Sequence, residues 1–350
     1  MGVSRSSRDP FDQLPDSLLL CIFNKLHDIK ALGRCAAVSK RFSTVVLQAE
    51  EVVVKVDCVI STEDSNLSMK GKSLLTSLFK VLVGSLVKPL HALQQLLTCK
   101  KSILPEVSHH SPGEVLKNFK GIRHLKIELP GGELGLNNGI VMKWRAEFGS
   151  TLESCVILAA SSLIKRDGDD NKVSKCTESC SVSGENSLTV QDGNGSIPES
   201  FFTNGGLKLR VVWTISSLIA ASARHYLLQQ IIIDHPTLES LTLADADGQG
   251  TLSMSKQQLV DFRDKPIAAS ASSNRTQVPA LNIRLWYAPF LDLPGGSAME
   301  GATLVAIRPS DHLAKKDSEA FLMNAFEEPF NNAAGSLVRG RTYLLEMNSF

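Results

Sequence analysis

The stretch DADGQGTLSMSK, residues 245–256, has the residue types of a calcium-binding loop. Suitable residues stand at its first, third, fifth and sixth positions: Asp245, Asp247, Gln249 and Gly250. The twelfth position, however, needs a glutamate that supplies two oxygens, and Lys256 stands there instead. The preceding residues LESLTL read as a strand rather than as a helix. The stretch therefore predicts a turn after a strand, in which Gly248 and Gly250 supply unusual φ angles, with a calcium site as the alternative.

Other motifs that could do chemistry are incomplete. Gly71-Lys72-Ser73 precedes an apolar segment as in a phosphate loop, but Asn66 stands where that loop needs a glycine. Cys176 and Cys180 have no second pair of ligands nearby, and the eight histidines form no H-E-x-x-H motif. The G-x-S-x-G motif of serine hydrolases is also absent from the sequence. We therefore expect a protein that is not an enzyme, with no catalytic residue, metal site or cofactor; nucleotide binding remains an alternative.

The composition is ordinary for a folded globular protein. The chain has 350 residues, of which 43% are hydrophobic, and 37 Lys and Arg balance 36 Asp and Glu. A net charge of +1 gives no reason to expect nucleic-acid binding. The seven cysteines are an odd number, and residues 1–13 are too polar for a secretory signal. We expect reduced thiols and a location in the nucleus, the cytoplasm or both.

The longest apolar segment, Leu74–Val87, is too short for a membrane span. It has 14 residues, includes Lys80, and is followed by Pro89, whereas a bilayer requires roughly 20. It predicts a buried helix, with a helix on a membrane surface as the alternative. The N-terminal MGVSRS fits the myristoylation template at Gly2, a short pattern that leaves lipidation open.

The elements that carry the strongest signal lie in the first fifty residues. Pro15 and Asp16 suit the first turn of a helix, and Asp28 and Ser39 are suitable N-caps for two more. In the first helix, five large apolar residues fall within about 140° of the helical projection: Leu18, Leu19, Ile22, Phe23 and Leu26. Leu20 and Cys21 lie outside that arc, so the helix is apolar on more than one side. Three short helices cannot bury all this surface among themselves, so we expect another part of the chain or another protein to cover it.

The segment FDQLPDSLLLCIFNKLHDIKALGRCAAVSKRFSTVV resembles an F-box, the helical module that binds a Skp-type adaptor of cullin–RING ubiquitin ligases. The family commonly has a tryptophan where this chain has Phe42. The resemblance implies that nine residues form or support the adaptor-docking face: Leu14, Pro15, Leu18, Ile22, Phe23, Leu26, Leu32, Val38 and Phe42.

After the N-terminal helices, strand-like and helix-like segments alternate irregularly. The sequence TLES occurs at residues 151–154 and 237–240, each time before an apolar run. The spacing h-x-x-h-x-h, in which h is apolar, begins at Ile122, Leu152, Leu238 and Val278, although chance alone would produce many such hits. The pattern resembles irregular leucine-rich repeats, and Trp286 is expected to end a core strand. Residues 167–200 are polar, without apolar periodicity, and predict a disordered insert.

The sequence therefore predicts an α/β protein: an F-box at 1–50, a repeat-like α/β domain in two parts at 51–166 and 201–350, and the insert between them. LTLADADGQGTL, PALNIRLWYAPFLDLP and GATLVAIRP resemble the plant group that includes the auxin-up-regulated F-box proteins. This resemblance implies a substrate receptor of a Skp–cullin–F-box ligase that binds an unknown target protein through its C-terminal domain. The alternative is an adaptor-binding scaffold or regulator without ligase output.

Overall fold

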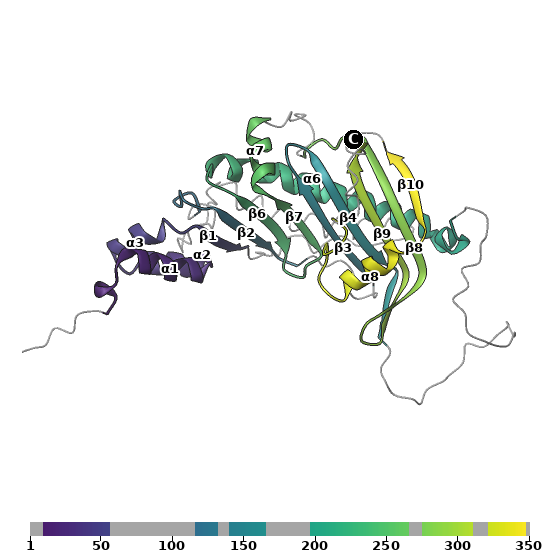
Figure 1. Cartoon of the computed structure of the whole chain (residues 1–350), viewed down its shortest axis with the longest axis horizontal. Coiled ribbons are helices and arrows are strands. Elements are labelled where there is room, and N and C mark those ends of the chain that lie inside the picture. Colours follow the sequence, from purple (N-terminus) through teal and green to yellow (C-terminus); the bar gives the residue numbers. More distant parts are fainter. Residues whose placement is uncertain are drawn as a thin grey trace, which may run out of the picture.

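The computed structural model describes residues 10–56, 116–131, 140–165, 197–265, 275–310 and 321–347. Within these ranges the chain is an α/β protein, in which N-terminal helices precede a domain built on one mixed sheet (Figure 1). The helices lie at one end of the sheet, beside β1. Among the described helices, none combines the length and hydropathy that crossing a bilayer requires.

The N-terminal helices form where the sequence predicts them. They are η1, Pro10–Gln13; α1, Asp16–Leu26; α2, Ile29–Ala36; and α3, Lys40–Val46. Pro15 caps α1 in an extended conformation that suits the residue before a helix. The Asp28 carboxylate accepts a hydrogen bond from the N–H of Ala31 at 2.9 Å, and the Ser39 hydroxyl accepts one from the N–H of Phe42 at 3.1 Å. Both predicted N-caps are therefore confirmed. They could be predicted from the sequence because each cap joins residues only three positions apart.

The sheet domain joins strands from both halves of the chain. Ten strands form one sheet in the order β1-β2-β6-β7-β3-β4-β9-β8-β10, with β5 beside β9. Their bounds are β1 Glu51–Lys55, β2 His124–Leu129, β3 Val141–Phe148, β4 Leu152–Ala160, β5 Ser162–Lys165, β6 Ser240–Asp245, β7 Gly250–Met254, β8 Leu281–Leu293, β9 Ser297–Pro309 and β10 Thr342–Met347. β6, which follows the polar residues 167–200, lies between β2 and β7.

The repeat-like geometry is limited to one end of this sheet. β1, β2 and β6 are parallel neighbours, as consecutive repeats would be. β3, β4, β9, β8 and β10 instead pair antiparallel in succession. All four segments with the h-x-x-h-x-h spacing lead into strands, and the three apolar residues of each pattern are buried in one core, the first core. The spacing identified strands correctly, but the pairing of those strands depends on contacts between distant parts of the chain.

Helices cover the two faces of the sheet unequally. α6, Gly206–Asp234, crosses the sheet on one face, and α8, Phe330–Val338, packs on the other over β8 and β9 (Figure 1). Residues of β4 alternate between two cores: Cys155, Ile157 and Ala159 belong to the first, and Val156 and Leu158 to the second. The first core extends from the sheet into α1–α3, since it contains Leu19, Phe23, Ile29 and Leu32. The remaining short elements are η3 Glu199–Phe201, η4 Thr203–Gly205 and α7 Lys256–Asp264.

Several expectations concern residues outside the described ranges. These are the apolar segment Leu74–Val87, Gly71-Lys72-Ser73, Gly2, and the polar insert apart from residues 197–200. Among the described residues, Cys21, Cys35 and Cys155 are free thiols. Trp286 is buried in the second core, as predicted, but it lies in the middle of β8 rather than at the end of a strand.

Candidate functional site

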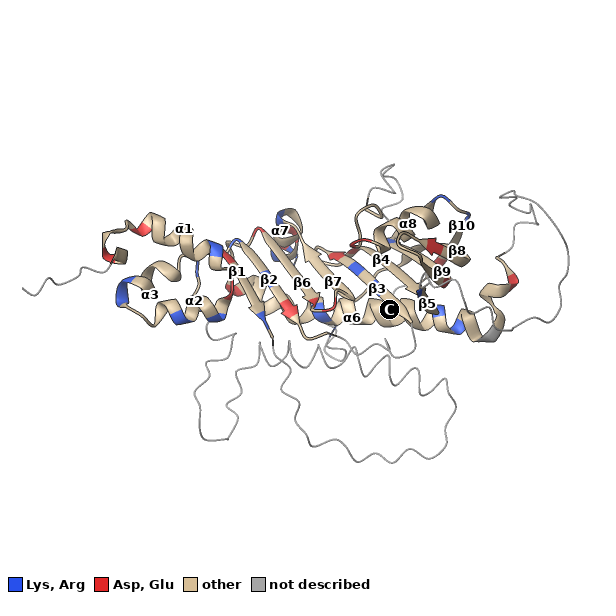
Figure 2. Cartoon of the chain, turned by 90° about the horizontal axis from the view of Figure 1, so that it is seen from below, with Lys and Arg blue, Asp and Glu red and all other residues tan. Residues whose placement is uncertain are grey.

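The exposed side of α1 is the candidate site. The side of α1 next to it is fixed, because Leu19 and Phe23 are buried in the first core. Leu18, Ile22 and Leu26, spaced four residues apart, remain 50%, 41% and 40% exposed. Residues at this spacing lie one above the other on a helix, so they form an apolar row along α1, which we call the α1 row. Figure 2 shows no charged position in α1 between Asp16 and Lys25. This apolar row is therefore a candidate contact surface for another molecule.

The nine residues expected at the docking face do not all lie on this surface. Phe23 and Leu32 are buried, so they can only support the surface from behind. Leu14 and Phe42 are partly buried and pack against the first core. Pro15 is exposed at the start of α1, and Val38 is 70% exposed in the turn after α2. With the three residues of the α1 row, Pro15 and Val38 are therefore the expected residues that are open to a partner.

An aromatic cluster holds α3 against α1. The Phe42 ring meets the rings of Phe11 and Phe23 edge to face, with centroids 5.7 Å and 5.4 Å apart. Phe11 is 46% exposed and extends the apolar surface beyond the expected residues. The sequence signal for Phe11 was that it is apolar and lies just before Leu14 and Pro15. Phe42 thus keeps the packing role of an aromatic residue without an indole N–H.

Arg41 fastens the start of α1 to α3, a role that the sequence did not reveal. Its guanidinium pairs with Asp16 at 2.7 Å, donates to the Phe11 carbonyl at 3.0 Å, and also donates to the Leu14 carbonyl. Asp16 stands 25 residues earlier in the chain, so only the folded structure brings the two together. Arg41 therefore fixes the orientation of the segment that leads into the α1 row.

The N-terminal helices are joined to the sheet by backbone hydrogen bonds. The N–H of Val53 in β1 donates to the His27 carbonyl at 2.7 Å, and the N–H of Glu50 donates to the Asn24 side chain at 2.9 Å. The Glu50 carbonyl in turn accepts from the N–H groups of Arg123 and His124, at 2.8 Å and 2.9 Å. Because the first core also runs through this junction, the candidate site has a fixed position relative to the sheet.

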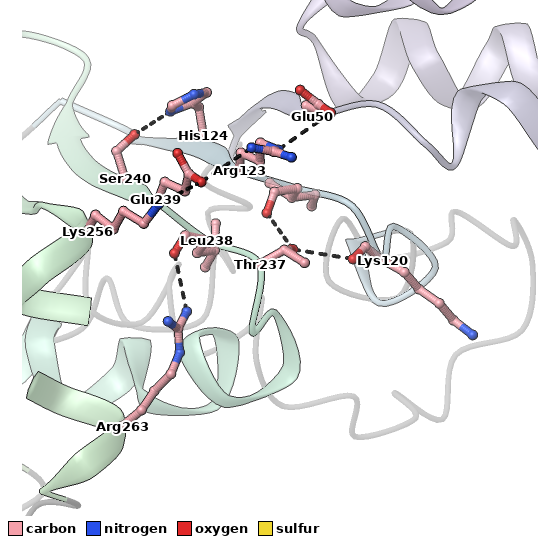
Figure 3. A network of polar contacts seen from close by, with 11 residues as sticks. Glu50, Lys120, Arg123, His124, Thr237, Leu238, Glu239, Ser240, Lys256 and Arg263 are labelled. Carbon is pink, nitrogen blue, oxygen red and sulfur yellow. Dashed lines mark hydrogen bonds and ion pairs between the residues drawn. The ribbon is translucent and has the colours of Figure 1, made fainter. Parts of the chain in front are cut away.

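Charged side chains add to the same junction (Figure 3). Arg123 lies between two carboxylates, 3.5 Å from Glu50 and 3.3 Å from Glu239, and Lys256 of α7 lies 3.1 Å from Glu239. The hydrogen bond from Lys256, followed by its charge, holds the pKa of Glu239 below its ordinary value. These side chains are partly exposed, so the pairs add little stability individually but link β2, β6, α7 and the end of the helical region.

The calcium-like loop is a hairpin closed by a buried ion pair. Asp245 lies 2.8 Å from Arg224 of α6 and accepts a hydrogen bond from the N–H of Gly250 at 2.9 Å. Burial raises the pKa of Asp245, and the charge of Arg224 opposes that shift. Both carboxylate oxygens are thus engaged by the protein. Within the described ranges, no three His, Cys, Asp or Glu side chains gather as metal ligands would.

The two glycines of this hairpin have different roles. Gly248 has a φ of +65°, which confirms the prediction of an unusual backbone angle. The prediction was wrong for Gly250, which is absent from the positive-φ residues. A Cβ atom at Gly250 would lie 2.4 Å from the Trp144 ring, so a glycine is required there for space.

The buried histidine of α6 has no partner that would suit it to acid–base chemistry. His225 stacks on Phe148, with centroids 4.4 Å apart, and its Nδ1 lies 2.8 Å from the Thr276 hydroxyl. Burial lowers the pKa of His225 to about 3, so the ring is neutral at physiological pH. Its role is structural.

The helices and the match of their sequence define the class of protein. Residues 11–50 match the F-box-like family, and the chain belongs to the F-box proteins. Such proteins are in general non-catalytic subunits that bind Skp-type adaptors in Skp–cullin–F-box ubiquitin ligases, and the chain has this general role of substrate adaptor.

Three relatives from Arabidopsis thaliana place the chain more closely. F-box protein At5g46170 is 54% identical over 374 residues, covering 98% of this chain and 94% of the relative. F-box proteins AUF1 and AUF2 are each 35% identical, covering 98% of this chain and 100% of the relative. The similarity to the auxin-up-regulated group is thus confirmed over nearly the whole chain. No solved structure shows a significant match.

Proposed function

We propose that this chain is the target-recognition subunit of a Skp–cullin–F-box ligase, acting in the nucleus, the cytoplasm or both. The α1 row docks the adaptor, and the sheet domain binds the target protein. The observation that carries the proposal is the division of α1 into a buried side, with Leu19 and Phe23, and an exposed apolar side. The buried side holds α1 in the fold, and the exposed side remains available to the adaptor.

The chemistry of the α1 row suits a protein partner. Full burial of a large apolar side chain contributes about 1.5–3 kcal/mol, so covering the remaining exposed area of three half-exposed residues contributes roughly 2–4 kcal/mol. Val38, Pro15 and Phe11 would extend the contact toward the roughly 1,200–2,000 Å² of a standard interface.

The proposed role requires no catalytic residue in this chain. A receptor that holds its target in the ligase raises the effective concentration of target lysines near the ubiquitin-charged enzyme. The fixed junction between α1–α3 and the sheet supports this role, because it keeps the distance between adaptor and target constant.

Co-expression with a Skp-type adaptor tests the docking surface. We expect the wild-type chain to co-purify with the adaptor and Ile22→Glu to lose at least nine-tenths of that recovery, because a buried unpaired carboxylate is costly. Ile233→Glu is the matched control: Ile233 is also exposed and helical, but it lies at the end of α6. Circular dichroism of each variant checks that the fold is intact.

Equal recovery of the adaptor with Ile22→Glu and wild type would overturn the docking surface. If the adaptor were recovered with neither, the proposed function itself would be wrong. Reconstitution with the ligase, followed by ubiquitin transfer to a bound target, separates a receptor from a scaffold without ligase output.

A further inference from the structure

The last strand of the sheet leaves one of its edges without a partner strand in the described part of the chain. β10 pairs with β8 from Thr342 opposite Trp286 to Met347 opposite Leu281. It is the terminal strand in the sheet order. The outer edge of such a strand directs every second residue's N–H and C=O groups away from the sheet, where another extended chain can pair with them.

Within the described part of the chain, β10 lacks the features that usually prevent such pairing. Proteins protect edge strands with lysines, prolines, bulges or a covering helix. The part of β8 that extends past β10 has Pro289, which has no N–H, and the charged Asp292. β10 has neither a lysine nor a proline, and its one charged residue is Glu346. Leu344 and Leu345 at its centre are 73% and 47% exposed.

The two leucines lie on opposite faces of the sheet. Leu345 is opposite Ile283, so it shares the face of the first core, against which Tyr343 and Met347 pack. Leu344 is opposite Arg284 and shares the other face with Thr342 and Glu346. A strand added to β10 would therefore find an apolar neighbour on each face, which favours a segment with apolar side chains on both sides.

We propose that β10 is the target-binding edge of this protein and that it receives an extended, apolar segment of the target protein as an additional strand. This inference rests on the proposed function. The occupant must be extended, because a helix has no unpaired backbone groups to offer an edge strand. A six-residue edge is small compared with the roughly 1,200 Å² of a stable dimer interface, so it suits one segment better than a second copy of this chain.

The position of β10 agrees with this role. β1 and β10 are separated by eight steps in the sheet order, and strands are about 4.8 Å apart, so the edge lies roughly 40 Å from β1. The N-terminal helices are at the β1 end (Figures 1 and 2). A target on β10 would therefore leave the α1 row free for the adaptor.

Peptide binding to the full-length chain tests the proposal. The probe is a fluorescein-labelled ten-residue peptide of six consecutive valines between two pairs of lysines, which has apolar side chains on both faces, and binding is measured by anisotropy. We expect saturable binding that Leu344→Lys weakens at least tenfold, because lysine at an edge opposes strand addition. Met323→Lys is the matched control, since Met323 is 46% exposed outside β10. The same peptide with N-methyl groups on its central residues should not bind, because it lacks the donors.

Hydrogen exchange locates the bound peptide. Amides of residues 342–347 should exchange more slowly with the peptide present. Equal affinity of wild type and Leu344→Lys, binding of the N-methylated peptide, or absence of protection in β10 would each overturn the proposal. So would a dimer in sedimentation equilibrium that Leu344→Lys dissociates, because the edge would then serve a second copy. Adaptor co-purification is measured separately, so its failure would count against the proposed function and not against peptide binding.

Discussion

The two edges of the sheet are built in opposite ways. At the first edge, β1 has charged residues at both ends, Glu51 and Lys55, and α1 and α2 pack beside it. At the other edge, β10 is exposed along most of its length and presents Leu344 and Leu345. Both strands pair through the same kind of backbone hydrogen bonds, and we attribute the difference to the separate functions proposed for the two edges. One edge is closed by the helices that carry the adaptor site, and the other is open to a partner.

Truncation of side chains should produce the largest contrast between the two edges. Phe23→Ala removes a buried ring from the core behind β1 and should lower the free energy of unfolding by about 3–5 kcal/mol. Leu344→Ala should change it by about 0.5 kcal/mol or less, because the side chain is already in water. Urea unfolding of both variants measures the difference. Similar losses would show that β10 is packed as firmly as the β1 edge.

Acid should weaken both edges together. His225 lies between them, on α6, and its pKa is about 3 in the folded chain, whereas its ordinary value is 6.5. The unfolded chain therefore takes up this proton first, so the stability is present above about pH 6.5 and is lost as the pH falls toward 3. Between pH 7 and pH 5 the loss should be about 2 kcal/mol.

Urea unfolding at the two pH values measures this loss, and His225→Gln should remove about 2 kcal/mol of the pH dependence. Hydrogen exchange, corrected for the pH dependence of the intrinsic rates, then measures the two edges separately. Some amides of β1 and β10 exchange only when the whole chain unfolds. These amides should lose protection by the same factor at both edges. If β1 alone lost protection, the two edges would belong to separate folding units and the comparison between them would fail.

The smallest effect is expected at the charged junction of the β1 edge. Arg123→Ala should cost about 0.2–1 kcal/mol, because its ion pairs with Glu50 and Glu239 are partly exposed. In 1 M salt this cost should fall close to zero. Arg339→Ala near β10 is the matched control, since its guanidinium donates to the Ser336 hydroxyl. A cost of several kcal/mol that salt does not reduce would show that the pairs, rather than the core and backbone bonds, hold the junction.

Much of the fold could be predicted because it is encoded locally. The caps at Asp28 and Ser39 and the start of α1 after Pro15 depend on residues within one turn. The strands β2, β4, β6 and β8 follow from apolar residues at short spacing. The pairing of β6 with β2 and the contact of Arg224 with Asp245 could not be predicted, because each joins distant parts of the chain.

The candidate site also combines features that the sequence predicts with features that only the tertiary structure decides. The sequence by itself determined that α1 is a helix with Leu18, Leu19, Ile22, Phe23 and Leu26 on one arc, since helical geometry fixes their directions. Only the tertiary structure decided which part of that arc is buried, because the packing of α3 and β1 covers Leu19 and Phe23 and leaves the other three exposed. In the same way, only the sheet order places TYLLEM, residues 342–347, at the end of the sheet, where Leu344 and Leu345 are exposed. The physical reason is that chain geometry is local, whereas burial depends on every element that packs nearby.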